Sequence, residues 1–193
     1  MSNARWWTGA VAATLLSCTA IMAVAEEKAT REVPAKDIKL TVPKAWKQEE
    51  PGGKFRVAQF KIDAVEGDKD AAELVITQFG GGGGGVDENV KRWSNQFDAK
   101  DRKLKITKGK SRQGEYVLVD ATGTYNRPDG PPVLQKTTKV SGQRMLAVML
   151  IAGDNGIYFL KLTGPEKTVT AAADDLRTSF GAKAEYEKEY KSE

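Results

Sequence analysis

Hydrophobic and polar residues alternate in several short runs of this chain, and this pattern predicts β-strands. Ile38, Leu40 and Val42 alternate with polar residues, and Pro43 ends the run. In residues 55–62 the apolar positions change phase halfway, which predicts a strand with a bulge or a twist. Residues 74–79 form a strongly apolar run that is typical of a strand. The first part of the chain is therefore expected to be mostly strand.

Two later segments repeat apolar residues at intervals of three or four, which predicts helices with one hydrophobic stripe. The first stripe consists of Val86, Val90, Trp93 and Phe97. The second stripe consists of Val169, Ala173, Leu176 and Phe180. Acidic residues at the start of the first helix suit the helix dipole, and Gly181 is a natural C-terminal cap for the second.

The remaining apolar runs predict further strands at residues 103–108, 115–125, 133–139, 144–152 and 157–162. Turn residues at 127–130 and 153–156 connect neighbouring runs, as in hairpins. Residues 144–152 and 157–162 are apolar at nearly every position, which is typical of central strands covered on both faces. The expected fold class is therefore α+β, with a central, mostly antiparallel sheet flanked by two amphipathic helices.

The first 25 residues have the pattern of a secretory signal peptide. Arg5 precedes an uncharged apolar run, and Ala23-Val24-Ala25 has the form of a signal-peptidase site. An uncleaved anchor is one alternative, because about 20 apolar residues can span a bilayer. A lipid anchor at Cys18 is another, because the residues before it loosely resemble a lipoprotein box. We expect export to the periplasm or the exterior, with no stable membrane span after cleavage.

The rest of the chain has the length of one domain. Residues 26–36 are polar and are expected to form a flexible lead. Residues 37–182 hold all the predicted strands and helices and are expected to form a single α+β domain. Residues 183–193 are expected to form a charged tail that is helical or frayed.

The composition excludes several kinds of chemistry. The chain has no histidine, and its one cysteine, Cys18, lies in the predicted signal. Zinc sites and Ser–His or Cys–His nucleophiles need these residues, so we expect no metal, no cofactor and no catalysis of that kind. The net charge is only +4 and the basic residues are not clustered, so nucleic-acid binding is not expected.

Several phrases of the sequence resemble small secreted bacterial proteins and the PsbP-like fold. Val42-Pro43-Lys44-Ala45-Trp46 is similar to a strand that ends in Pro-x-x-Trp, and Arg177-Thr178-Ser179-Phe180 to a final helix that ends in Ser-Phe. The resemblance implies an α/β/α sandwich. Members of that superfamily include an extrinsic photosystem II subunit and a Ran-binding factor, which act by docking to other proteins. It therefore implies a protein partner in the cell envelope, and metal-binding histidines of some members have no counterpart here.

A run of glycines between a predicted strand and a predicted helix is the most conspicuous candidate site. It consists of Gly80, Gly81, Gly82, Gly83, Gly84 and Gly85. Three interpretations remain open: a phosphate cradle at a helix start, a flexible connector, and a contact surface where bare backbone lets a partner approach. Asp87 and Glu88 would repel an anion, and the P-loop sequence G-K-[ST] is absent.

Four other residues join the candidate binding surface. Asp87 and Asn89 begin the helix after the glycines, Trp46 follows a strand end, and Arg127 lies in a Pro/Gly turn. Trp46 and Arg127 also have plain structural explanations, in the core and in a turn. A cluster of acidic residues at 68–73 suggests either a calcium site or a solvated turn.

These observations favour an exported, non-catalytic accessory domain that binds another protein through the glycine segment. The alternative is a domain that binds a small molecule or an ion with the same segment, and an enzyme based on carboxylates or lysine is the third possibility. A concave pocket beside the glycines would favour the small ligand. A flat, exposed apolar patch would favour the protein partner.

Overall fold

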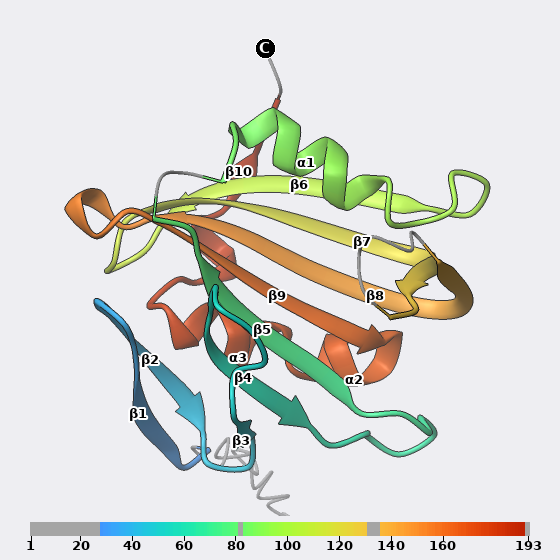
Figure 1. Cartoon of the computed structure of the whole chain (residues 1–193), viewed down its shortest axis with the longest axis horizontal. Coiled ribbons are helices and arrows are strands. Elements are labelled where there is room, and N and C mark those ends of the chain that lie inside the picture. Colours follow the sequence, from blue (N-terminus) through green and yellow to red (C-terminus); the bar gives the residue numbers. More distant parts are fainter. Residues whose placement is uncertain (1–27, 81–82, 131–135, 192–193) are drawn as a thin grey trace, which may run out of the picture.

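The computed structural model describes residues 28–80, 83–130 and 136–191, which build an antiparallel sheet with helices on both faces (Figure 1). The predicted signal peptide therefore lies outside the described residues. In spatial order the main sheet consists of β10 (Lys188–Glu189), β6 (Lys103–Lys110), β7 (Glu115–Pro128), β8 (Thr137–Ile151), β9 (Ile157–Pro165), β5 (Ala72–Gln78), β4 (Arg56–Ile62) and β3 (Lys47–Glu49). The α+β class and the antiparallel sheet are confirmed.

One face of the sheet is covered by two helices and a hairpin. The helices are α2 (Glu166–Ala171) and α3 (Ala173–Ser179), and the hairpin joins β1 (Thr30–Ala35) to β2 (Ile38–Pro43). The second predicted helix is thus divided at Ala172. Its stripe packs into the core as expected, because Val169, Leu176 and Phe180 are completely buried there. Gly181 ends α3 with a positive φ of 80°, and Ala182 N–H donates to the carbonyl oxygen of Arg177, as in a Schellman cap.

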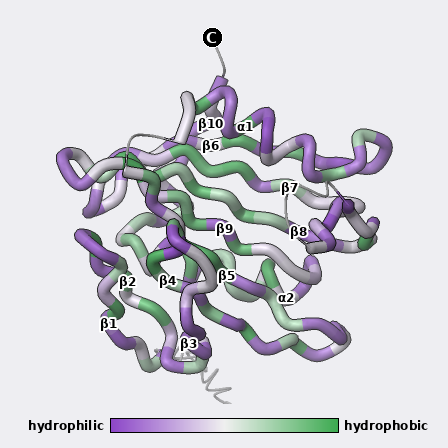
Figure 2. The backbone as a smooth tube through the Cα atoms, viewed as in Figure 1, coloured by the Kyte–Doolittle hydropathy of each residue, from purple (hydrophilic) through white to green (hydrophobic). Residues whose placement is uncertain are grey.

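The other face of the sheet is only partly covered. Helix α1 (Val86–Ser94) crosses it near β7, and Trp93 and the following Phe97 pack on the central strands. Hydrophobic residues are concentrated along these central strands (Figure 2). The part of this face over β4, β5 and β9 is not covered by α1 (Figure 1), so side chains that point outward there meet solvent.

The N-terminal segment is more ordered than its composition predicts. Residues 26–36 were expected to be flexible, but β1 pairs with β2 along its whole length. Val33 and Ala35 are buried, and Lys36 adopts a positive φ of 58° in the two-residue turn between the strands. The expectation of a flexible lead is therefore wrong for Thr30–Ala35.

The C-terminal segment is also part of the domain. Residues 183–193 were expected to be a charged tail, but β10 pairs with β6. The carboxylate of Glu187 is nearly buried and accepts hydrogen bonds from Arg177, Thr107 and Tyr116. Charge alone did not predict this, because the partner of Glu187 is a buried arginine on the preceding helix, α3.

The central strands are longer than predicted. Residues 137–139 of one predicted run and 144–151 of the next belong to one strand, β8, which pairs with β7 as far as Pro128, while residues 133–135 lie outside the described residues. The predicted bulge in the 55–62 run is confirmed, because the register of β4 against β5 shifts between Arg56 and Ala58. The described residues contain no helix long and apolar enough to cross a membrane.

Candidate functional site

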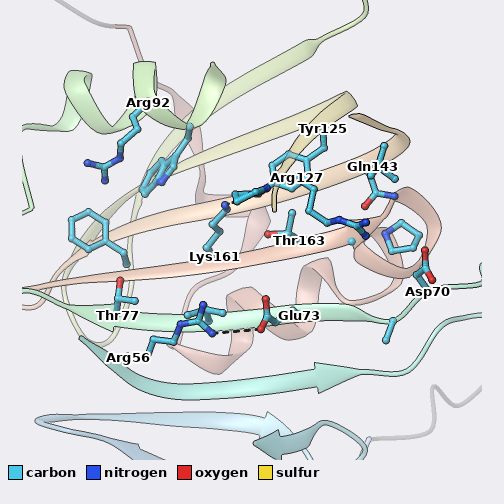
Figure 3. Close-up of a pocket in the computed structure, with 18 of the residues that line it drawn as sticks. Arg56, Asp70, Glu73, Thr77, Arg92, Tyr125, Arg127, Gln143, Lys161 and Thr163 are labelled. Atoms are coloured by element: carbon cyan, nitrogen blue, oxygen red, sulfur yellow. Dashed lines mark hydrogen bonds and ion pairs between the residues drawn. The ribbon is translucent and has the colours of Figure 1, made fainter. Parts of the chain in front are cut away.

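A hollow of about 650 Å³ opens on the uncovered part of the sheet (Figure 3). Strands β4, β5 and β9 form its floor, and α1 and the end of β7 form its walls. The polar and charged residues that line it are Arg56, Asp70, Glu73, Thr77, Arg92, Tyr125, Arg127, Gln143, Lys161 and Thr163. Its volume is in the range of pockets that hold a small organic molecule.

The period of two along each strand places these side chains on one face. In β9, Phe159, Lys161 and Thr163 face the hollow, while the residues between them are buried in the opposite core. In β5, Glu73, Val75 and Thr77 alternate in the same way. The antiparallel register sets Val75 opposite Lys161 and Thr77 opposite Phe159. The floor is therefore built on paired central strands and is rigid.

Lys161 is the central polar residue of the floor. Its Nζ donates to Gln96 Oε1 at 2.6 Å and to the Tyr125 hydroxyl at 3.0 Å, and it lies 5.3 Å from the centre of the Tyr125 ring. Among the described residues no carboxylate forms an ion pair with it. An ammonium has three N–H donors, so one donor is left for a molecule in the hollow.

The surroundings of Lys161 disfavour its positive charge. Burial lowers the pKa of its ammonium to about 8. Glu73 opposes this shift, and the positive charges of Arg92 and Arg56 strengthen it. A negative group placed among these three cations would remove the repulsion between them.

The two carboxylates of the hollow lie apart from each other. Glu73 forms an ion pair with Arg56 at 3.7 Å and accepts a hydrogen bond from Gln59 at 2.9 Å. Asp70 lies away from Glu73, toward the side of the hollow where Gln143 also lies (Figure 3). Basic residues outnumber acidic ones in the lining, because Arg56, Arg92, Arg127 and Lys161 face only Asp70 and Glu73. The hollow therefore suits an anion.

Aromatic rings form one wall of the hollow. The rings of Phe79 and Phe159 meet edge to face with centroids 5.7 Å apart, and Trp93 meets Phe159 in the same way at 5.9 Å. Phe55 lies on the outer side of Phe79, at 5.0 Å, and is 48% exposed. Lys161 pairs with Val75 and Phe159 pairs with Thr77, so this wall begins two residues from Lys161, at the next pair on the same face of the sheet.

The glycine segment borders the aromatic wall and is held in place by α1. Asn89 is completely buried and its amide donates to the carbonyl oxygens of Gly83, Gly84 and Gly85. A side chain at Gly83 would meet the Phe159 ring at 2.4 Å, so only glycine allows this approach. The expectation of a flexible connector is therefore wrong for Gly83–Gly85, while Gly81 and Gly82 lie outside the described residues.

The structure separates the other predicted site residues. Asn89 was expected at a contact surface, but its side chain is buried and donates hydrogen bonds to the glycine segment. Trp46 is 4% exposed and packs against Phe60 in the core on the opposite face of the sheet, so it cannot join a surface with the glycines. Asp87 is exposed and accepts a hydrogen bond from Tyr190. Of these residues only Arg127 reaches the hollow, where its side chain lies near Thr163 (Figure 3).

The structure separates the acidic residues at 68–73, because Asp70 and Glu73 line the hollow while Asp68 serves the fold. Asp68 accepts hydrogen bonds from the backbone N–H and the hydroxyl of Thr168 in the first turn of α2. In the part of the chain that the structure describes, no group of three or more metal-ligating side chains comes together.

The main residues of the hollow were not predicted from the sequence. Lys161 was hidden in the apolar run 157–162, although a lysine within a central strand is itself a signal. Arg56, Glu73 and Arg92 lie on three different elements, and only their pairing brings them together. No protein-family model matches this chain, and a search of curated proteins finds no significant match. The site must therefore be interpreted from its own geometry.

Proposed function

We propose that this protein binds a small organic anion in the hollow above β5 and β9. The observation that carries the proposal is the ammonium of Lys161, which faces the hollow without a carboxylate partner among the described residues, beside Arg56 and Arg92. An anion there would accept the remaining N–H of Lys161 and neutralise the excess positive charge. The sequence raised a small-ligand site as the alternative, but at the glycine backbone, whereas the site proposed here lies on the sheet.

The proposed role is binding rather than catalysis. The Glu73 carboxylate is engaged by Arg56 and Gln59, and Asp70 lies at the far end of the hollow, so no pair of carboxylates is arranged for acid–base chemistry. Burial raises the pKa of Tyr125 to about 12, which keeps its hydroxyl protonated at neutral pH. If the predicted signal directs export, the anion is met in the periplasm or outside the cell.

Isothermal titration calorimetry of the full chain with acetate, benzoate and citrate tests the proposal. We expect at least one of these anions to bind with millimolar affinity or tighter, and Lys161→Met to weaken that binding about tenfold or more. Lys105→Met, on the exposed side of β6, is the matched control and should bind as the wild type does. Equal binding by wild type and Lys161→Met, or no binding of any of the three anions, would refute the proposal.

A protein partner is the second candidate, and one observation favours it. Phe55 is exposed and stacks on Phe79 beside Gly80, so an apolar contact point borders the glycine segment. An accessory domain of the PsbP-like type would dock a partner from the cell envelope here. Photo-crosslinking from position 54, beside Phe55, should then capture one specific protein in cells, and adding Phe55→Ser to the same chain should abolish that capture. Crosslinks that do not depend on Phe55 would exclude this surface.

A further inference from the structure

We infer that the anion bound in the hollow carries a flat aromatic body, so that the ligand is an aryl carboxylate or a similar amphipathic anion. This inference rests on the proposed anion site and adds the nature of the rest of the ligand. It is carried by the position of the aromatic wall of Phe79, Trp93 and Phe159 directly beside the cationic centre at Lys161.

The spacing on the sheet sets the size of the ligand. Lys161 and Phe159 lie two residues apart on the same face of β9, and a strand rises about 3.3 Å per residue. The two side chains therefore leave the sheet about 6–7 Å apart, and a ligand that meets both needs a charge and an apolar body that together span this distance. A carboxylate attached directly to a two-ring system comes close to this span from its charge to its far ring, whereas acetate would reach the cations and leave the wall empty.

The wall offers more than apolar area. Its rings already meet edge to face, and an aromatic ligand extends that arrangement. Arg56 lies on the β4 side of the hollow and Arg92 on the α1 side (Figure 3), and a planar guanidinium can stack on an aromatic ring. An aryl body between them would be held from both sides, whereas a cationic aryl compound would be repelled by both arginines.

Calorimetric titration of the full chain with three probes tests this inference. The probes are 2-naphthoate, acetate and 2-naphthylmethylammonium. We expect 2-naphthoate to bind at least tenfold more tightly than acetate, and the naphthyl cation to bind at least tenfold more weakly than 2-naphthoate. The comparison with acetate isolates the aromatic body, and the comparison with the cation isolates the charge.

Two variants separate the two parts of the site. Phe79→Leu, at a half-buried position, should weaken 2-naphthoate several-fold and leave acetate unchanged. Lys161→Met should weaken both anions. Tyr186→Leu is the control, because this exposed aromatic residue lies outside the hollow.

Each outcome decides between the proposals. If acetate and 2-naphthoate bind equally well and both depend on Lys161, the anion site stands and the aromatic class is wrong. If the naphthyl cation binds as tightly as 2-naphthoate, charge does not select the ligand and both proposals are wrong. If Phe79→Leu weakens acetate as much as 2-naphthoate, the variant disturbs the fold of the site, and Phe159→Leu, which removes another ring of the same wall, replaces it with the same expectation. An equal loss of both anions in this second variant would show that the aromatic class is wrong.

Discussion

Replacing Lys161 by methionine should change how the stability of this protein depends on pH. In the folded chain the pKa of Lys161 falls from 10.5 to about 8, mainly because of burial. Between these two values the unfolded chain binds more protons than the folded one, so the free energy of unfolding rises with pH. Below pH 8 the cost of holding the charge is fully present, and above pH 10.5 it is gone.

The size of the effect follows from the shift. One pKa unit corresponds to about 1.4 kcal/mol, so the lowered pKa of Lys161 costs about 3 kcal/mol of stability at neutral pH. Lys161→Met removes this cost and leaves every other titrating group in place. The free energy of unfolding of the wild type, minus that of Lys161→Met, should therefore increase by about 3 kcal/mol between pH 7 and pH 11.

Urea unfolding followed by circular dichroism at several pH values between 7 and 11 measures this difference. Lys105→Met, which removes an exposed lysine outside the hollow, provides the control. A flat difference for Lys161→Met, or one that falls with pH, would show that the ammonium of Lys161 is not disfavoured in the folded chain. The case for an anion site at this lysine would then fail.

Three further changes test other parts of the structure. The affinity for 2-naphthoate should fall up to about tenfold per pH unit above pH 8 in the wild type, because the ammonium of Lys161 loses its proton there. Lys161→Arg should remove this dependence on pH. Calorimetry at pH 7, 8 and 9 measures both affinities. Glu187→Gln should lower the free energy of unfolding by about 3 kcal/mol, because it leaves the buried arginine of α3 without its counter-charge. Urea unfolding measures this loss. An equal loss in the exposed Glu189→Gln variant would contradict the explanation. Asn89→Ala removes three hydrogen bonds to glycine carbonyls and should lower the free energy of unfolding by about 2 kcal/mol. Hydrogen exchange of the backbone amides in the glycine segment should become faster. If exchange there is no faster than in the control variant Asn95→Ala, Asn89 does not hold the segment.

The elements whose apolar residues recur at a regular spacing could be predicted from the sequence. The stripe of the first helix and the alternation of residues 38–42 describe packing faces directly, and both elements form, although α1 ends at Ser94 and Phe97 of the stripe lies beyond it. Thr30–Ala35 was missed because it contributes only two buried apolar side chains, and its stability comes from pairing with β2. A strand of this kind is defined by its partner rather than by its own composition.

The candidate site could not be predicted in the same way. Phe159 and Lys161 belong to one strand, but Arg56 and Arg92 approach them only through the register of β4 against β5 and the position of α1. Asn89 looked like a surface residue because it lies near the start of a helix, and its burial depends on how the glycine segment folds back over it. These contacts join residues from different elements, so they depend on the tertiary structure and leave no pattern in the sequence.

The short strands at the two ends of the sheet have a consequence for the behaviour of the protein at high concentration. β3 has three residues and β10 has two, and β10 covers only part of β6, whose exposed residues include Lys103, Lys105 and Lys108. A neighbouring molecule that tried to extend the sheet would find little backbone to pair with at β3 and a row of like charges at β6. The chain can therefore keep a wide, open sheet face for a ligand while its sheet edges resist edge-to-edge association with other copies of the protein.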